Sequence, residues 1–123
     1  RLIGQKSHAE GLQHYQDEPV DLLINVSSSE GLPVSIMEAF SFGVPAIVTA
    51  VGGSPEIVTV SCGHHLAPDF EPTQLARLLE EHDLDEQVLR AGALEMQHTN
   101  YSSKRNQAAF AAEIHSAMQR KQD

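Results

Sequence analysis

The chain has 123 residues, of which 41% are hydrophobic and 20% are charged. This length suits a single domain, and the composition is that of a globular protein with a buried core rather than a disordered chain. The 8 Lys and Arg residues are outnumbered by 17 Asp and Glu residues, so the net charge is −9. Because this charge repels phosphates and anionic lipid head groups, we expect no nucleic-acid partner.

The cysteine content and the apolar runs bear on the compartment of the protein. The single cysteine, Cys62, cannot form a disulfide within the chain, which suits a reducing compartment, and we expect it to be a small buried hydrophobe rather than a nucleophile. No apolar run reaches the roughly 20 residues of a membrane span, and no signal peptide opens the chain. We therefore expect a cytoplasmic location, with a full-length protein at the periphery of the inner membrane as the alternative. Since the first residue is Arg1 rather than methionine, we expect a chain cut from a longer protein.

The first half of the sequence alternates short apolar runs with turn signals, which predicts alternating strands and helices. Residues 2–4 predict a short strand, and residues 7–16 predict a helix with Ser7 as its N-cap and Glu10 as its capping-box partner. The run of residues 20–26, VDLLINV, is nearly all apolar, which is typical of a strand buried on both faces. We therefore expect a central parallel strand there.

The alternation continues through the middle of the chain. A polar loop over residues 27–32 precedes Pro33, which is well placed in the first turn of a helix that Gly43 ends. Residues 46–50 predict a further buried strand, and residues 55–58 predict a short helical turn.

Residues 64–67 predict one more short strand, and the rest of the chain is helical by its period and its scarcity of Gly and Pro. Three helices are predicted there, over residues 72–81, 85–96 and 106–120. The last of them carries an apolar stripe that we expect in the core, with a groove for a partner as the alternative: Phe110, Ile114 and Met118. Together these elements predict an α/β fold, with a parallel sheet of three to four strands flanked by helices and followed by terminal helices.

The loops at one edge of this sheet are the predicted binding region. In an open parallel sheet, ligands bind beyond the carboxyl ends of the strands, where loops meet the N-termini of helices. Three loops fall at this edge, at residues 4–7, 27–32 and 51–54. Helix N-termini offer unpaired N–H groups and a partial positive charge, which favours a phosphate or diphosphate ligand there.

Two carboxylates flank the helix start that follows the second loop. Glu30 precedes the helix, and Glu38 lies on it five residues past Pro33, about 7–8 Å along the axis. A sugar nucleotide has a central diphosphate and hydroxyl-rich rings at both ends, so an anion site between two hydroxyl acceptors matches it. The alternative is a pair of solvated charges that only stabilise the helix start.

The stretch from Ser29 to Phe40, SEGLPVSIMEAF, resembles the Glu, seven residues, Glu motif of the retaining GT-B glycosyltransferases known as group-one glycosyl transferases. Residues 42–48 and 51–58 are similar to the following segments of that family, and Gly63 stands in the expected place. The resemblance implies a partial Rossmann-like sheet, which is half of the nucleotide-binding domain of a GT-B enzyme.

The resemblance also assigns roles to single residues. It implies that Glu30 is the catalytic residue, which faces the hydroxyls of the donor sugar, and that Glu38 binds the ribose hydroxyls. The backbone at the helix start would meet the sugar and the diphosphate, and the loop before the first helix would contact the base. These donor-binding residues are Gly31, Leu32, Pro33, Val34, Gln5 and Lys6.

The resemblance further implies the reaction. It is the transfer of a sugar from a nucleotide-diphosphate sugar to an unknown sugar or lipid-linked acceptor, with retained stereochemistry, in polysaccharide biosynthesis. No cofactor and no bound metal are expected, since the helix dipole and basic side chains take the charge that a divalent ion carries elsewhere.

The same resemblance places the chain in a larger protein. Residues 1–123 would be the C-terminal portion of the donor-binding domain, with the α/β donor-site part at 1–68 and the terminal helices at 69–123. The N-terminal acceptor domain and the donor-phosphate Arg and Lys would be absent, so we expect the fragment alone to be inactive.

Several features leave alternatives open. The chain as a whole fits a non-catalytic module that binds nucleotide sugar or phosphate, or a structural fragment that self-associates through a truncated sheet edge. Gly52 and Gly53 fit either a plain tight turn or a part of the site, and Glu56 is expected to stabilise its own short helix. The seven histidines do not predict a metal site, because His64 and His65 are adjacent in a strand and point to opposite faces.

Overall fold

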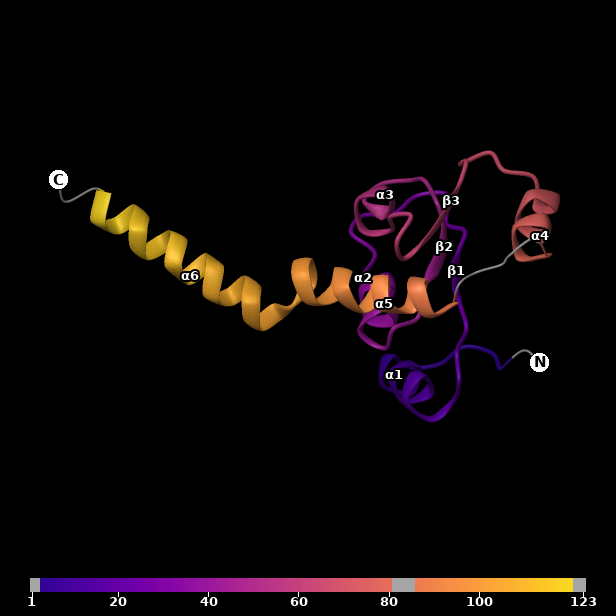
Figure 1. Cartoon of the computed structure of the whole chain (residues 1–123), viewed down its shortest axis with the longest axis horizontal. Coiled ribbons are helices and arrows are strands. Elements are labelled where there is room, and N and C mark those ends of the chain that lie inside the picture. Colours follow the sequence, from indigo (N-terminus) through magenta and orange to yellow (C-terminus); the bar gives the residue numbers. More distant parts are fainter. Residues whose placement is uncertain (1–2, 81–85, 121–123) are drawn as a thin grey trace.

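The computed structural model describes residues 3–80 and 86–120, in which one small parallel sheet is flanked by helices (Figure 1). The strands are β1 (Leu23–Asn25), β2 (Ala46–Thr49) and β3 (Gly63–Leu66). The helices of the first half are α1 (His8–Asp17), α2 (Val34–Ser41) and α3 (Ser54–Ile57). Those of the second half are α4 (Pro72–Glu80), α5 (Glu86–Met96), the π-helix η1 (Gln97–Tyr101) and α6 (Ser103–Arg120). The predicted α/β fold is confirmed.

The sheet has the order β1-β2-β3, with both pairs of neighbours parallel. Ala46 of β2 is aligned with Leu23 of β1 on one side and with Gly63 of β3 on the other. All four residues of β2 are buried, so the central strand of the described sheet is β2.

The prediction that residues 20–26 form a central strand buried on both faces is therefore wrong. β1 spans three residues at the edge of the sheet, and the side chains of Ile24 and Val26 are 41% and 46% exposed. The predicted first strand, at residues 2–4, would have paired with the outer side of β1. Ile3 and Gly4 are not in a strand, and Leu2 lies outside the described residues. Without that strand alongside, β1 has only β2 as a partner in the described part of the chain.

Local signals fix the helix ends that position the loops. The capping box of α1 is confirmed, because the backbone N–H of Glu10 donates to Ser7 Oγ at 3.3 Å and that of Ser7 donates to Glu10 Oε2 at 2.8 Å. α2 has Pro33 as its N-cap residue, one position before the first helical residue Val34. Gly43 follows its last turn with a φ of +68°, the left-handed backbone that ends helices and favours glycine.

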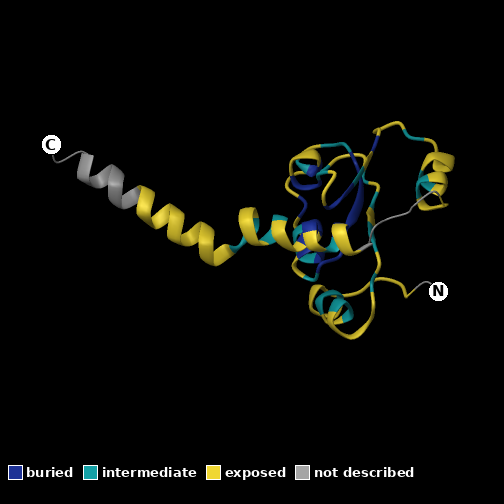
Figure 2. Cartoon of the chain, in the orientation of Figure 1, coloured by how far each residue is buried: buried dark blue, intermediate teal, exposed yellow. Residues whose placement is uncertain are grey.

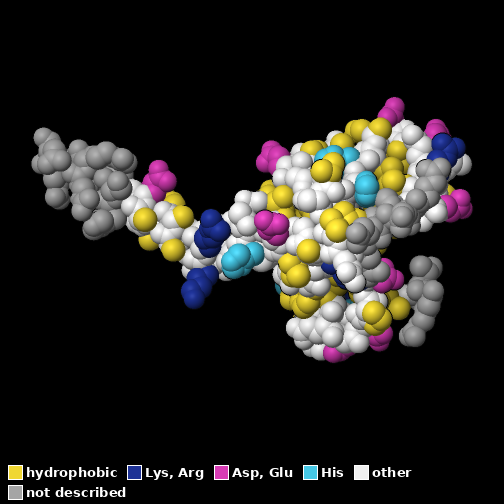
Figure 3. Space-filling model, in the orientation of Figure 1, with side chains coloured by type: hydrophobic (Ala, Val, Ile, Leu, Met, Phe, Trp, Pro, Cys, Tyr) yellow, Lys and Arg dark blue, Asp and Glu magenta, His cyan; other side chains and the backbone are white. Residues whose placement is uncertain are grey.

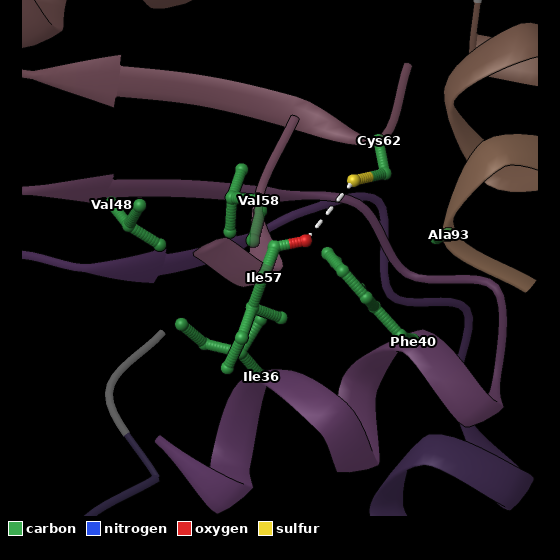
Figure 4. Close-up of a cluster of buried hydrophobic side chains, with 8 residues drawn as sticks. Ile36, Phe40, Val48, Ile57, Val58, Cys62 and Ala93 are labelled. Carbon is green, nitrogen blue, oxygen red and sulfur yellow. Dashed lines mark hydrogen bonds between the residues drawn. The ribbon is translucent and has the colours of Figure 1, made fainter. Parts of the chain in front are cut away.

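The core lies between the sheet and the helices α2, α3 and α5 (Figure 2). Figure 4 shows Ile36 and Phe40 of α2 projecting toward the sheet that carries Val48, with Ala93 of α5 on the side of Cys62. Cys62 is fully buried beside them, as predicted, and its Sγ lies 3.7 Å from the carbonyl oxygen of Ile57.

The last helix departs from the prediction of a packed stripe. Ser102 is extended after η1, and α6 leaves the body of the molecule from there (Figure 1). Phe110 is consequently 68% exposed rather than part of the core, while the side chains of Ile114 and Met118 lie outside those described. Across the parts of the chain that the structure covers, no helix combines the length and apolar character needed to span a bilayer.

Candidate functional site

Two loops meet at the carboxyl edge of the sheet. Because β1 and β2 are parallel, the residues that follow Asn25 and Thr49 lie at the same edge. Thr49 Oγ1 donates a hydrogen bond to the carbonyl oxygen of Ser27, and this contact ties the end of β2 to the loop after β1. The loop at residues 4–7, in contrast, precedes α1 without following a strand in the described structure.

Gly52 and Gly53 hold the loop that carries Glu30. The backbone N–H of Gly53 donates to the carbonyl oxygen of Gly31 at 3.0 Å. Gly52 has a φ of +53°, and a Cβ atom there would lie 1.8 Å from the carbonyl oxygen of Glu30. A Cβ on Gly53 would lie 2.8 Å from the carbonyl oxygen of Gly31. These two glycines therefore form a turn that also permits the close approach of two loops.

The Glu30 carboxylate is held by the end of β1. Asn25 Nδ2 donates to Glu30 Oε1 at 3.0 Å, while Asn25 Oδ1 accepts from Ser27 Oγ at 2.7 Å and from the Ser27 backbone N–H at 3.2 Å. Hydrogen bonds from Ser27 and Asn25 to the carboxylate lower the pKa of Glu30. Glu30 is therefore a charged acceptor at neutral pH. Sequence reasoning missed Asn25, although a polar residue that ends an apolar strand at the ligand edge is a usable signal.

Glu38 lies one turn inside α2 and makes its contact with α1. His8 Nε2 is 2.5 Å from Glu38 Oε1, and the two side chains are 71% and 25% exposed. Burial, and secondarily the charge of Glu38, raises the pKa of Tyr15, which lies on α1 like His8. The Tyr15 ring stacks on Phe42 with centroids 5.4 Å apart. The sequence contains no signal for this contact, since the seven histidines were considered only as metal ligands.

The start of α2 lies between the two glutamates in the sequence, as predicted. Its first turn carries no acidic side chain, so no carboxylate of its own neutralises the positive end of the helix. The residues at this end are exposed except Pro33, which is buried: Gly31, Leu32, Pro33 and Val34.

The predicted base-contacting residues, Gln5 and Lys6, are exposed in the segment before α1. Lys6 Nζ lies 3.9 Å from Glu10 Oε1. The contact between His8 and Glu38 joins this segment to α2. The acidic side chains are otherwise spread over the visible face of the molecule rather than gathered in one patch (Figure 3).

The other residues considered in the sequence, two histidines and one glutamate, lie in or near β3 and α3. His64 is half-buried and His65 is exposed, and His65 Nε2 lies 2.6 Å from the carbonyl oxygen of Val58. Glu56 is in the first turn of the four-residue helix α3. Among the residues whose positions are described, no three His, Cys, Asp or Glu side chains are grouped so that they could hold a metal ion.

Comparison with known proteins identifies a family. A family model described as "Glycosyl transferases group 1" matches residues 1–95. The chain is 29% identical over 83 residues to the amylovoran biosynthesis glycosyltransferase AmsK of Erwinia amylovora, covering 64% of this chain and 20% of the relative.

Two relatives named as putative colanic acid biosynthesis glycosyltransferase WcaL are similar as well. The protein from Salmonella typhimurium is 34% identical over 82 residues, covering 59% of this chain and 20% of the relative. The protein from Escherichia coli is 36% identical over 67 residues, covering 51% of this chain and 16% of the relative. The chain thus matches about a fifth of the length of these curated relatives.

Proposed function

Because this chain belongs to the group 1 glycosyltransferase family, we propose that it forms part of the donor site of an enzyme that transfers a sugar from a nucleoside-diphosphate sugar with retention of configuration. The observation that carries this proposal is the start of α2 between Glu30 and Glu38, with one carboxylate held from β1 and the other from α1. The acceptor is an unknown sugar or lipid-linked acceptor, in line with the polysaccharide pathways in the names of the relatives.

The diphosphate binds at the N-terminus of α2. The exposed residues Gly31, Leu32 and Val34 carry backbone N–H groups there, and the positive end of the helix dipole stabilises the negative charge. Since the first turn has no acidic side chain, no carboxylate of that turn competes with an anion for the helix end.

The two glutamates bind the two carbohydrate rings of the donor, which are the transferred sugar and the ribose. Glu30 is the catalytic residue and accepts hydrogen bonds from hydroxyls of the donor sugar, which its lowered pKa favours by keeping it charged. Glu38 accepts hydrogen bonds from the ribose hydroxyls. Backbone atoms of Gln5 and Lys6 contact the base. The acceptor domain and the basic residues for the donor phosphates come from other parts of the longer enzyme, so this chain binds the donor without transferring the sugar.

Calorimetric titration with UDP, GDP and ADP tests the donor site. We expect one of these nucleotides to bind the chain, and Glu38→Gln to weaken its binding by roughly tenfold, the effect of losing a charged hydrogen-bond acceptor. Glu113→Gln, on the exposed part of α6, is the matched control and leaves the affinity unchanged. The donor-site proposal fails if no nucleotide binds at millimolar concentration, or if both variants bind like the wild-type chain.

The edge of the sheet favours a second candidate, which is self-association. β1 has no partner on its outer side among the described strands, and Ile24 within it and Val26 just after it are exposed. An unpaired strand edge with apolar side chains is a template for pairing with another chain. In this alternative, a second copy of the chain or a strand of the longer enzyme pairs with β1.

A further inference from the structure

We propose that His8 is a positioning residue for Glu38, and that it orients this carboxylate toward the ribose of the bound nucleotide. The inference rests on the proposed function, because it assumes that Glu38 meets the ribose. His8 itself would not touch the sugar. Its role is to hold one oxygen of Glu38 so that the other points in one direction.

The geometry of the pair supports this role. His8 Nε2 lies 2.5 Å from Glu38 Oε1, so the ring N–H is placed to donate a hydrogen bond to the carboxylate. A carboxylate has two oxygens with about four lone-pair positions, so the bond from His8 leaves acceptor capacity for a ribose hydroxyl. A free glutamate side chain samples several rotamers, whereas a side chain fixed at one oxygen loses less entropy when a ligand binds.

The backbone that carries His8 is fixed relative to α2. His8 is the first residue of α1 and lies between the two capping-box residues Ser7 and Glu10, so the backbone at this point is fixed. Tyr15 stacks on Phe42 just after α2, which is a second contact between the two segments.

The pair also connects two parts of the proposed site. Gln5 and Lys6, proposed to contact the base, are two or three residues before His8 in the chain. Glu38, proposed to bind the ribose, is across the helix contact. Base and ribose would therefore be recognised by a single unit made of α1 and α2, and the contact between His8 and Glu38 would set their relative placement.

The test is the discrimination between a ribonucleoside diphosphate and its 2′-deoxy analogue. For each variant, the ratio of the two Kd values is measured by calorimetry with the nucleotide that binds the wild-type chain. We expect His8→Ala to reduce this ratio by roughly three- to tenfold, as for a lost hydrogen bond that holds a charged group. His8→Gln keeps an N–H donor and should restore most of the ratio. His98→Ala, an exposed histidine of η1, should leave the ratio unchanged.

The outcomes separate this inference from the proposed function. If Glu38→Gln abolishes the discrimination but His8→Ala leaves it intact, the role of His8 is refuted and that of Glu38 stands. If His8→Ala binds the ribonucleotide more tightly than the wild-type chain does, His8 competes with the ribose and the inference is overturned. If Glu38→Gln leaves the discrimination unchanged, the proposed ribose role itself fails. Because each ratio compares two ligands on one variant, partial unfolding affects both Kd values equally and does not change the ratio.

Discussion

Gly52 is the residue whose replacement should disturb the site most through the backbone alone. In Gly52→Ala, the new Cβ would lie 1.8 Å from the carbonyl oxygen of Glu30 and 2.7 Å from its carbonyl carbon. Both are backbone atoms, so no flexible side chain can move aside. The loop that carries Glu30 must therefore shift away from the turn by more than about 1 Å to reach ordinary van der Waals contact.

The cost follows from two separate terms. A residue other than glycine with a φ of +53° loses about 1–2 kcal/mol in the left-handed region. The forced shift also strains the hydrogen bond from the Gly53 N–H to the Gly31 carbonyl oxygen, and losing such a bond costs about 1 kcal/mol. We expect a decrease of about 2–3 kcal/mol in the free energy of unfolding, which corresponds to a fall in Tm of roughly 8–12 °C for a domain of this size.

Urea and thermal unfolding followed by circular dichroism measure this change. Gly11→Ala is the matched control: Gly11 lies inside α1, has no positive φ and has nothing within 4 Å of a built Cβ. Alanine should stabilise that helix by about 0.5–1 kcal/mol. If Gly52→Ala unfolds within about 0.5 kcal/mol of the wild-type chain, the two loops are not in the close contact described, and the support for Glu30 from this turn is refuted.

Three further predictions concern the charge, the edge and the metal dependence of the site. Asn25→Ala removes a hydrogen bond that lowers the pKa of Glu30, so this pKa should rise toward its ordinary value in a carboxyl NMR titration; an unchanged pKa would contradict the contact. The pKa of Glu30 is lower in the folded chain than in the unfolded chain, so Glu30 stabilises the fold at a pH above its unfolded pKa. This stabilisation is lost as the pH falls through the pKa of the folded chain, and Asn25→Ala should make the loss smaller. If the outer edge of β1 drives self-association, sedimentation velocity should detect dimers of the wild-type chain, and Val26→Lys should abolish them. A wild-type chain that stays monomeric at all concentrations would exclude this alternative. Replacing Mg²⁺ with EDTA should change the nucleotide Kd by less than about twofold, because α2 and not an ion takes the diphosphate charge; a tenfold loss would require a metal.

The parts of the fold that depend on neighbouring residues in the sequence could be predicted. Ser7 and Glu10 specify the start of α1, and Gly43 specifies the end of α2, because a capping box and a left-handed glycine act within one helical turn. The apolar run at β2 was sufficient to predict a buried strand, since β1 and β3 flank it and the helices α2, α3 and α5 contribute to the core that contains its side chains.

The position of a strand or helix relative to the rest of the fold was harder to predict. The run at residues 20–26 is as apolar as a central strand, but its place in the sheet depends on which strands pair with it, and hydropathy contains no information about that. Phe110 has the spacing of a core residue, but the π-helix before it and the extended Ser102 direct α6 away from the sheet. A change of direction over a few residues thus decided the exposure of a whole helix.

The same distinction applies to the site. The spacing of Glu30 and Glu38 specifies two carboxylates and a helix start between them, but the groups that hold them lie elsewhere in the sequence. Asn25 belongs to the preceding strand, Gly52 to the next loop, and His8 to a helix 30 residues before Glu38. Such contacts exist only once the chain is folded, so no sequence motif of fixed spacing can contain them. They also give independent tests: substitutions at Asn25 and Gly52 should act on the sugar side of the nucleotide, and substitutions at His8 on the ribose side. If all three variants weakened the binding of every ligand equally, the two carboxylates would not be recognising separate rings.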